Sequence, residues 1–209
     1  MSTRSERLKL TAAGLQLEAL WTSGFDAKAS AVLAPPHPVY GGTLSNPVVV
    51  AAADSLTRSR IAALRFNYRG TEDSEGSATD DLAAAVEDYG AAFTELRARA
   101  AGPYLLAGYS FGAGTALLVA QSDARVAGLV LLAPPVGMLR AEDLAAFPGK
   151  LLVVVGDDDD YAPLAELTAL LTAKPDAVLE VIPGADHFFH YGGLSALGER
   201  IEAHVKTWF

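Results

Sequence analysis

The sequence predicts an α/β fold with a mostly parallel, doubly wound sheet and an antiparallel N-terminal hairpin. Two short apolar runs, 8–11 and 15–21, flank the small turn Ala12-Ala13-Gly14, which is typical of a hairpin. From residue 29 onward, apolar runs alternate with helical stretches. These runs are nearly continuous, as in parallel strands that are covered on both faces. The strands expected after the hairpin are 31–34, 61–67, 104–109, 128–133, 151–155 and 178–182.

Several helical stretches carry recognisable ends. Asn46-Pro47 and Pro163 have the residue types that begin helices, and Asp80-Asp81 place negative charge at the start of another. The last helix is expected over about 194–208, and a short one over 141–147.

Length and composition indicate one globular domain over residues 1–209. Hydrophobic residues make up 51% of the chain and charged residues 20%, which is enough apolar material for a packed core. No internal repeat or linker interrupts this pattern.

Charge and hydropathy exclude several classes of partner. The formal net charge of -9 and the lack of a basic run argue against nucleic acid as a partner. No segment reaches the roughly 18 apolar residues of a membrane span, and the polar start is unlike a signal peptide. We therefore expect a cytoplasmic protein with no membrane partner, and the sequence carries no signal for the oligomeric state. The absence of cysteine rules out a thiolate nucleophile and a Cys-ligated zinc.

A glycine-flanked serine is the main candidate for chemistry. In Gly108-Tyr109-Ser110-Phe111-Gly112, an apolar strand leads into Ser110 and a helical stretch follows it. A serine on a sharp strand-to-helix turn needs neighbours without bulk, and it is then lifted clear of the sheet as a nucleophile. The start of the helix also offers the N–H of Phe111 to an oxyanion. The structural alternative is a buried serine in a tight turn.

The general base is chosen among four histidines. His204 lies within the last helix, and His37 lies before a proline on an early loop, where it suits loop structure. His187 lies on the loop just past the strand 178–182, at the kind of strand end where α/β sheets place reactive groups. His190 is the weaker candidate, and a purely structural role for His187 is the alternative.

The acid is sought in the aspartate run 157–160, which follows the strand 151–155. A carboxylate there gives the chain order Ser, Asp, His and would hold the imidazole tautomer. Four adjacent aspartates leave the choice open at this point. The run is also compatible with a solvated acidic turn or a weak cation site.

With these residues in place, the chain resembles the α/β-hydrolase superfamily, and in particular the small lidless bacterial serine hydrolases of the dienelactone-hydrolase-like branch. The resemblance covers nearly the whole chain. Besides the serine motif, it rests on Pro36-His37-Pro38-Val39-Tyr40-Gly41-Gly42-Thr43 with Asn46-Pro47-Val48-Val49, on Arg65-Phe66-Asn67-Tyr68-Arg69-Gly70 with Ser74 and Gly76, and on Gly184-Ala185-Asp186-His187-Phe188-Phe189.

The resemblance implies a carboxylesterase with Ser110 as nucleophile, His187 as base and Asp159 as the acid. It also implies Val39 as the second oxyanion donor beside Phe111, with the neighbouring Tyr40 as the alternative donor. Only 136–149 separates two expected strands, so a large lid is not expected and small soluble esters are the expected substrates. Tyr40, Tyr109 and Phe188 are the candidates for contact with substrate.

Several alternatives remain open at this stage. The same machinery serves thioesters, lactones and small amides, and a fold can persist after activity is lost, leaving a binding protein. A metal-dependent hydrolase using the aspartate run and His187 or His190 is a third alternative. No dinucleotide or phosphate-binding glycine motif is present, so no cofactor is expected, and the preferred interpretation includes no metal.

Overall fold

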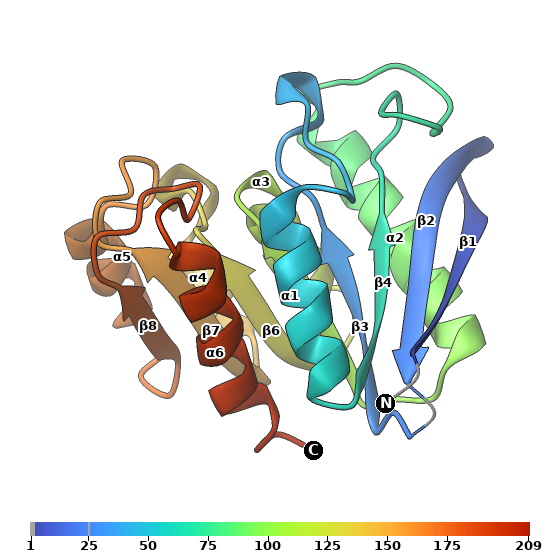
Figure 1. The fold of residues 1–209 in the computed structure, drawn as a ribbon. Helices are drawn as coiled ribbons and strands as arrows, with labels where there is room; N and C mark the ends of the chain where they lie inside the picture. Colours follow the sequence, from blue (N-terminus) through green and yellow to red (C-terminus); the bar gives the residue numbers. More distant parts are fainter. Residues whose placement is uncertain (1–2, 25) are drawn as a thin grey trace.

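The computed structural model describes residues 3–24 and 26–209. Its eight-stranded sheet has the order β1-β2-β4-β3-β5-β6-β7-β8 (Figure 1). The pairs β1–β2 and β2–β4 are antiparallel, and every other pair is parallel, so the predicted fold class is confirmed. The strands are β1 (Thr3–Ala12), β2 (Leu15–Gly24), β3 (Ala29–Ala34), β4 (Ile61–Phe66), β5 (Tyr104–Tyr109), β6 (Val126–Leu132), β7 (Lys150–Gly156) and β8 (Val178–Ile182).

The N-terminal hairpin is longer than its apolar pattern predicted. β1 and β2 pair from Ala12↔Leu15 out to Thr3↔Gly24. The outer half of β1 is polar, with Arg4, Glu6 and Arg7. Backbone pairing continues there because antiparallel hydrogen bonds do not depend on apolar side chains, and β1 is an edge strand of the sheet.

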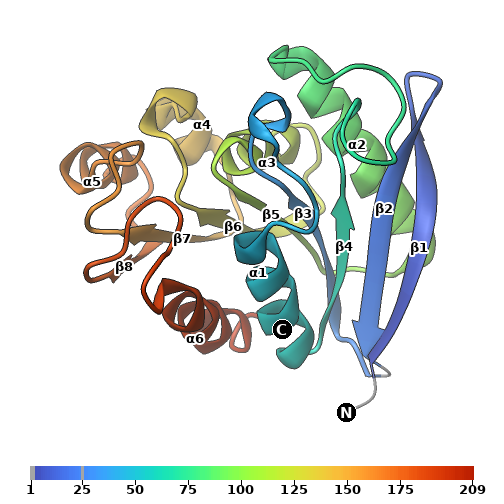
Figure 2. The same cartoon turned by 45° about the horizontal axis from the view of Figure 1, so that its top comes forward.

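Helices cover both faces of the sheet (Figure 2). α1 and α6 pack against each other on one face, whereas α2, α3, α4 and α5 form a chain of contacts on the other. Each face has its own buried apolar cluster. The helices are α1 (Pro47–Arg58), α2 (Leu82–Arg99), α3 (Phe111–Ala120), α4 (Ala141–Ala146), α5 (Leu164–Leu171) and α6 (Gly193–Val205).

Helix ends follow the capping residues of the sequence. The Asn46 side chain accepts a hydrogen bond from the N–H of Val48 at the start of α1, and Asp81 does the same for Ala83 in α2. α6 ends earlier than predicted, because the chain leaves the helix after Val205 in a turn. In the part of the chain that the structure describes, no helix is long and apolar enough to cross a membrane.

The carboxyl ends of the parallel strands meet at one edge of the sheet, where the loops after β3, β5, β7 and β8 come together. Only a short 3-10 helix, η2 (Val136–Met138), and α4 lie between β6 and β7. This edge is therefore not covered by an inserted domain.

Candidate active site

Ser110 sits on a sharp turn between β5 and α3. Its φ of 54° lies in the left-handed region, which costs a non-glycine residue energy and is typical of functional turns. The turn brings backbone very close to both flanking glycines. A Cβ on Gly108 would lie 2.0 Å from the carbonyl oxygen of Gly112, and one on Gly112 would lie 2.5 Å from that of Pro35. The glycines predicted to give this turn room are thus required by its packing.

Three side chains from three loops form one hydrogen-bonded row. The Nε2 of His187 lies 2.9 Å from the Oγ of Ser110. On the other side of the ring, Nδ1 lies 3.0 and 2.9 Å from the two carboxylate oxygens of Asp159. Ser110 follows β5, Asp159 follows β7 and His187 follows β8, so residues far apart in sequence meet at one edge of the sheet.

The environment of His187 sets its tautomer. Asp159 and His187 are 4% and 7% exposed, so their interaction is shielded from water. A carboxylate accepts hydrogen bonds, so Nδ1 carries a hydrogen and donates a hydrogen bond to Asp159. Nε2 is then free to accept the hydroxyl hydrogen of Ser110.

The structure separates the four aspartates. Only Asp159 is buried, and its Oδ1 also accepts hydrogen bonds from the N–H groups of Tyr161 and Ala162, at 2.9 and 3.0 Å. Asp157 turns the other way and accepts from the N–H of Gly184 at 2.6 Å. Asp158 and Asp160 are exposed. Of the run, only Asp159 reaches the imidazole.

The two histidines that follow His187 in the chain, His190 and His204, each contact an acidic side chain. The Nδ1 of His190 lies 2.7 Å from Asp186, whose other oxygen accepts from the backbone N–H groups of Phe188 and His190. These N–H groups, that of His190 first, lower the pKa of Asp186. His204 contacts Glu180 at 2.6 Å on the surface of the protein.

The loop after β3 differs from expectation at Val39. The N–H of Val39 donates to the Nδ1 of His37 at 3.2 Å, and Val39 is 50% exposed and does not line the cavity beside Ser110. The N–H of Tyr40 donates to the carbonyl of His37. In the described part of the chain, the N–H of His37 has no such acceptor. Burial lowers the pKa of His37, and Asp80 opposes that shift, so the ring is neutral and can accept from Val39 at neutral pH.

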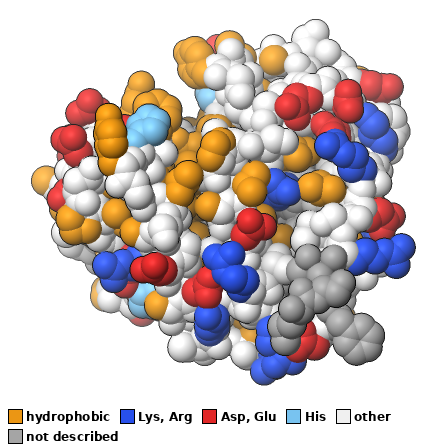
Figure 3. All heavy atoms as spheres, in the orientation of Figure 1, with side chains coloured by type: hydrophobic (Ala, Val, Ile, Leu, Met, Phe, Trp, Pro, Cys, Tyr) orange, Lys and Arg blue, Asp and Glu red, His pale blue; other side chains and the backbone are white. Residues whose placement is uncertain are grey.

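A cavity of about 330 Å³ opens at Ser110. Tyr40, Tyr109 and Phe188, the candidates for contact with substrate, are among the residues that line it. Tyr161 and Met138 line it as well and were not singled out. The ring of Tyr161 lies 4.7 Å from that of His187, and its only sequence signal is its place two residues after Asp159. Figure 3 shows hydrophobic and histidine side chains on both sides of a notch along the upper edge of the molecule.

Among the described residues, no group of three or more histidine, aspartate or glutamate side chains could hold a metal ion. The aspartate run does not converge, because Asp157 and Asp159 point to different partners. The site is a serine, an imidazole and a carboxylate beside an apolar cavity.

Comparison with known proteins assigns the family. A protein-family model described as an alpha/beta hydrolase domain matches residues 40–206. The chain belongs to the α/β-hydrolase family. The hydrolase is similar to an uncharacterized protein of Rickettsia prowazekii, with 31% identity over 167 residues, 75% of this chain and 70% of that one.

Two solved structures resemble the hydrolase over nearly all of their length. One is an alpha-beta serine hydrolase homologue from Coxiella burnetii, with a TM-score of 0.86, 30% identity and coverage of 96% of this chain and 97% of that one. The other, from Xanthomonas campestris, is described as a serine hydrolase without a lid. It has a TM-score of 0.86, 28% identity and coverage of 100% and 97%.

Proposed function

We propose that this hydrolase cleaves small carboxylic esters through an acyl-enzyme on Ser110. The observation that supports it is the continuous row from Asp159 through His187 to Ser110, which ends at the cavity. A serine hydroxyl is a weak nucleophile unless an adjacent base takes its proton, and this row supplies the base and the group that orients it.

The first half of the reaction transfers the acyl group. The Oγ of Ser110 attacks the ester carbonyl while Nε2 of His187 takes its proton, and the carbonyl oxygen becomes an oxyanion. The tetrahedral intermediate then collapses, the carbon–oxygen bond to the alcohol breaks, and His187 protonates the leaving alkoxide. Asp159 stabilises the imidazolium between these two proton transfers.

Two backbone N–H groups are proposed to bind the oxyanion. Phe111 begins α3, so its N–H has no acceptor within the helix. For the second donor we propose His37 in place of Val39. His37 lines the cavity, and among the described residues its N–H has no acceptor, whereas the N–H of Val39 donates to the His37 ring.

The second half releases the acid. Water enters the cavity, His187 takes its proton, and the hydroxyl attacks the acyl carbon so that Ser110 leaves with the proton returned by His187. The short segment between β6 and β7 leaves the cavity open, which suits a small ester in solution.

The test is the intact mass of the protein after brief exposure to a fluorophosphonate, followed by peptide mapping and a panel of short esters. A single adduct on Ser110 and ester turnover are expected, and Ser110→Ala should lose both, with turnover falling on the order of 10⁴ to 10⁶-fold. An unlabelled, folded wild-type protein would overturn the proposal and favour a binding role for the fold. Faster turnover of a thioester, a lactone or a small amide in the same panel would identify a different leaving group.

A further inference from the structure

A second cavity adjoins the catalytic one. Its volume is about 430 Å³, and it shares Asn46, Tyr109 and Phe188 with the catalytic cavity. Phe188 follows His187 directly in the chain and is 54% exposed. A molecule bound at Ser110 can therefore extend past the ring of Phe188 into a second space.

The walls of this second cavity are mostly rings and aliphatic side chains. Phe189 and Tyr191 come from the loop between β8 and α6, while Val48 and Leu194 come from the first turns of α1 and α6. In the described part of the chain, its lining contains no aspartate, glutamate, lysine or arginine. A ligand here must present an apolar surface, and aromatic walls favour a ring that can stack offset or edge-to-face.

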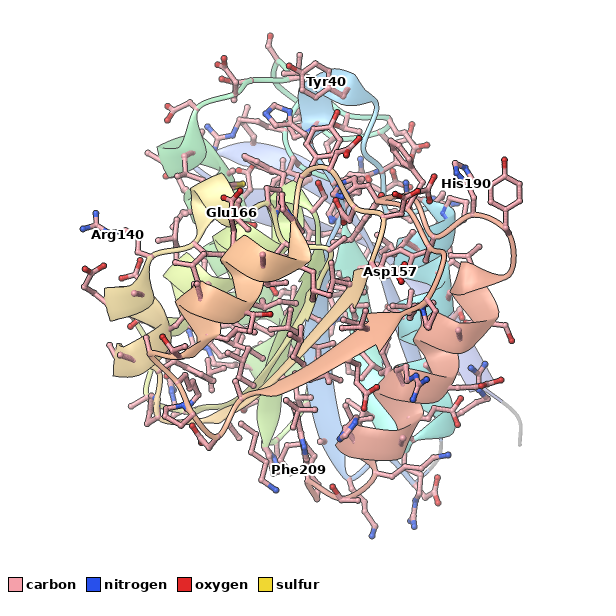
Figure 4. The ribbon with its side chains drawn as sticks, turned by 90° about the vertical axis from the view of Figure 1, so that its left-hand side faces the viewer. Tyr40, Arg140, Asp157, Glu166, His190 and Phe209 are labelled. Atoms are coloured by element: carbon pink, nitrogen blue, oxygen red, sulfur yellow. The ribbon has the colours of Figure 1, made fainter. Side chains whose placement is uncertain are left out.

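Among the described residues, the exposed aromatic side chains gather at these two cavities. Tyr40 and Tyr161 line the catalytic cavity, Tyr191 lines the second, and Phe188 lines both. Figure 4 shows Tyr40 and His190 at the same end of the molecule on two different loops. Large apolar side chains concentrated in one exposed place usually mark a contact surface.

The loop that carries the second cavity is held in a costly conformation. Phe189 and Tyr191 have φ values of 55° and 54°, in the left-handed region that non-glycine residues avoid. Asp186 supports the loop by accepting two backbone hydrogen bonds and by contacting the Nδ1 of His190. Strained conformations of this kind are kept where they place side chains for a ligand.

We propose that the second cavity binds an aromatic ring on one arm of the ester, while the catalytic cavity holds the ester group itself. This inference rests on the proposed function, because the cavity is assigned to the same substrate. It narrows the substrate class from small esters to esters whose acyl or alcohol arm carries a ring.

The kinetic test compares ethyl acetate with benzyl acetate and with ethyl phenylacetate. At least one of the two ring-bearing esters is expected to show a kcat/KM about ten-fold or more above that of ethyl acetate. Even one extra methylene in a fitting pocket is worth about 10-fold. A preference for benzyl acetate would place the alcohol arm in the second cavity, and a preference for ethyl phenylacetate would place the acyl arm there. Equal kcat/KM values for all three esters overturn the proposal while leaving the ester hydrolase intact.

Two variants test whether the preference for a ring-bearing ester depends on the second cavity. Leu194→Trp fills it, and Tyr191→Ala removes a ring that is fully exposed and therefore contributes little to folding. Both variants should bring the ratio of kcat/KM for the preferred ring-bearing ester to kcat/KM for ethyl acetate toward one. Leu170→Trp adds the same bulk at a half-buried leucine of α5, outside both cavities, and should keep the wild-type ratio. An unchanged ratio in folded Leu194→Trp and in Tyr191→Ala counts against the proposal.

A binding measurement separates failure of the subsite from failure of the proposed function. Benzyl alcohol and phenylacetate are titrated into the protein, and the methyl signals of Val48, Leu194 and Leu170 are followed by NMR. Saturable shifts at Val48 and Leu194 with Leu170 unmoved support the aromatic subsite even if no ester is cleaved. No shift at either methyl group overturns it even if Ser110 is labelled by the fluorophosphonate.

Discussion

The hydroxyl of Tyr109 donates a hydrogen bond to the backbone carbonyl of His187, at 3.1 Å. Tyr109 is the last residue of β5 and directly precedes Ser110, whereas His187 lies on the loop after β8. The bond is buried and ties the turn at Ser110 to the loop that carries the imidazole. Burial raises the pKa of Tyr109, so its hydroxyl stays protonated and keeps donating at neutral and alkaline pH.

Tyr109→Phe should lower kcat with little change in KM. The ring that lines the cavity remains, so substrate binding is kept, but the loop that carries His187 loses one hydrogen bond. If that bond holds the imidazole in place for the transition state, its loss lowers kcat by up to about ten-fold. Tyr104→Phe is the matched control. Tyr104 lies at the other end of β5 and donates to the backbone carbonyl of Ala100 at 3.0 Å, away from the site. Equal kcat losses in the two variants would show that the Tyr109 bond acts only on general stability.

Asp159→Asn should lower kcat by about 10⁴-fold while the protein stays folded, because an amide cannot stabilise the imidazolium and favours the wrong tautomer. Asp158→Asn makes the same change on an exposed neighbour and should stay within a few-fold of wild type. Steady-state kinetics on one ester compares the two. A larger loss in Asp158→Asn would contradict the choice of Asp159.

Two glycine substitutions should have opposite effects on stability. Gly108→Ala places a methyl group 2.0 Å from the carbonyl oxygen of Gly112, so the free energy of unfolding should fall by at least about 2 kcal/mol. Gly90→Ala lies in α2, where the new carbon meets no other side chain or segment within 4 Å, and should raise the free energy of unfolding by about 0.5 to 1 kcal/mol. Urea unfolding measures both. Similar stabilities for the two variants would mean that the turn at Ser110 relaxes without cost.

His37 should make stability fall with acid. Burial lowers its pKa in the folded protein, so the folded state favours the neutral ring, which accepts from Val39. Its contribution is complete above the unfolded pKa of about 6.5 and is lost as the pH falls below that value toward the folded pKa. His37→Asn keeps a neutral acceptor at this position without a titrating group.

The melting temperatures of wild type and His37→Asn should therefore diverge on acidification. Between about pH 7.5 and pH 5, the wild type should lose more than the variant. Parallel melting curves over this range would show that the His37 ring does not titrate differently in the folded and unfolded states. Comparing the two proteins at each pH removes every contribution that both share.

The sequence by itself determined the fold class, and it selected Ser110 and His187 as the residues to examine. Near-continuous apolar runs indicate parallel strands because both faces of such strands are buried, and a glycine-flanked serine after one of them indicates a tight turn into a helix. These signals are local, so they can be read from neighbouring residues. The resemblance to known hydrolases then selected Asp159 from four candidates.

Only the tertiary structure decided which groups actually meet. Asp159 turns toward His187 while Asp157 turns toward Gly184, a difference that adjacent identical residues cannot encode locally. The N–H of Val39 is engaged because the side chain of His37 folds back onto it. The second cavity exists because the first turns of α1 and α6 lie beside the loop after β8. Such contacts join residues distant along the chain, and their geometry is set by the packing of the whole sheet and its helices.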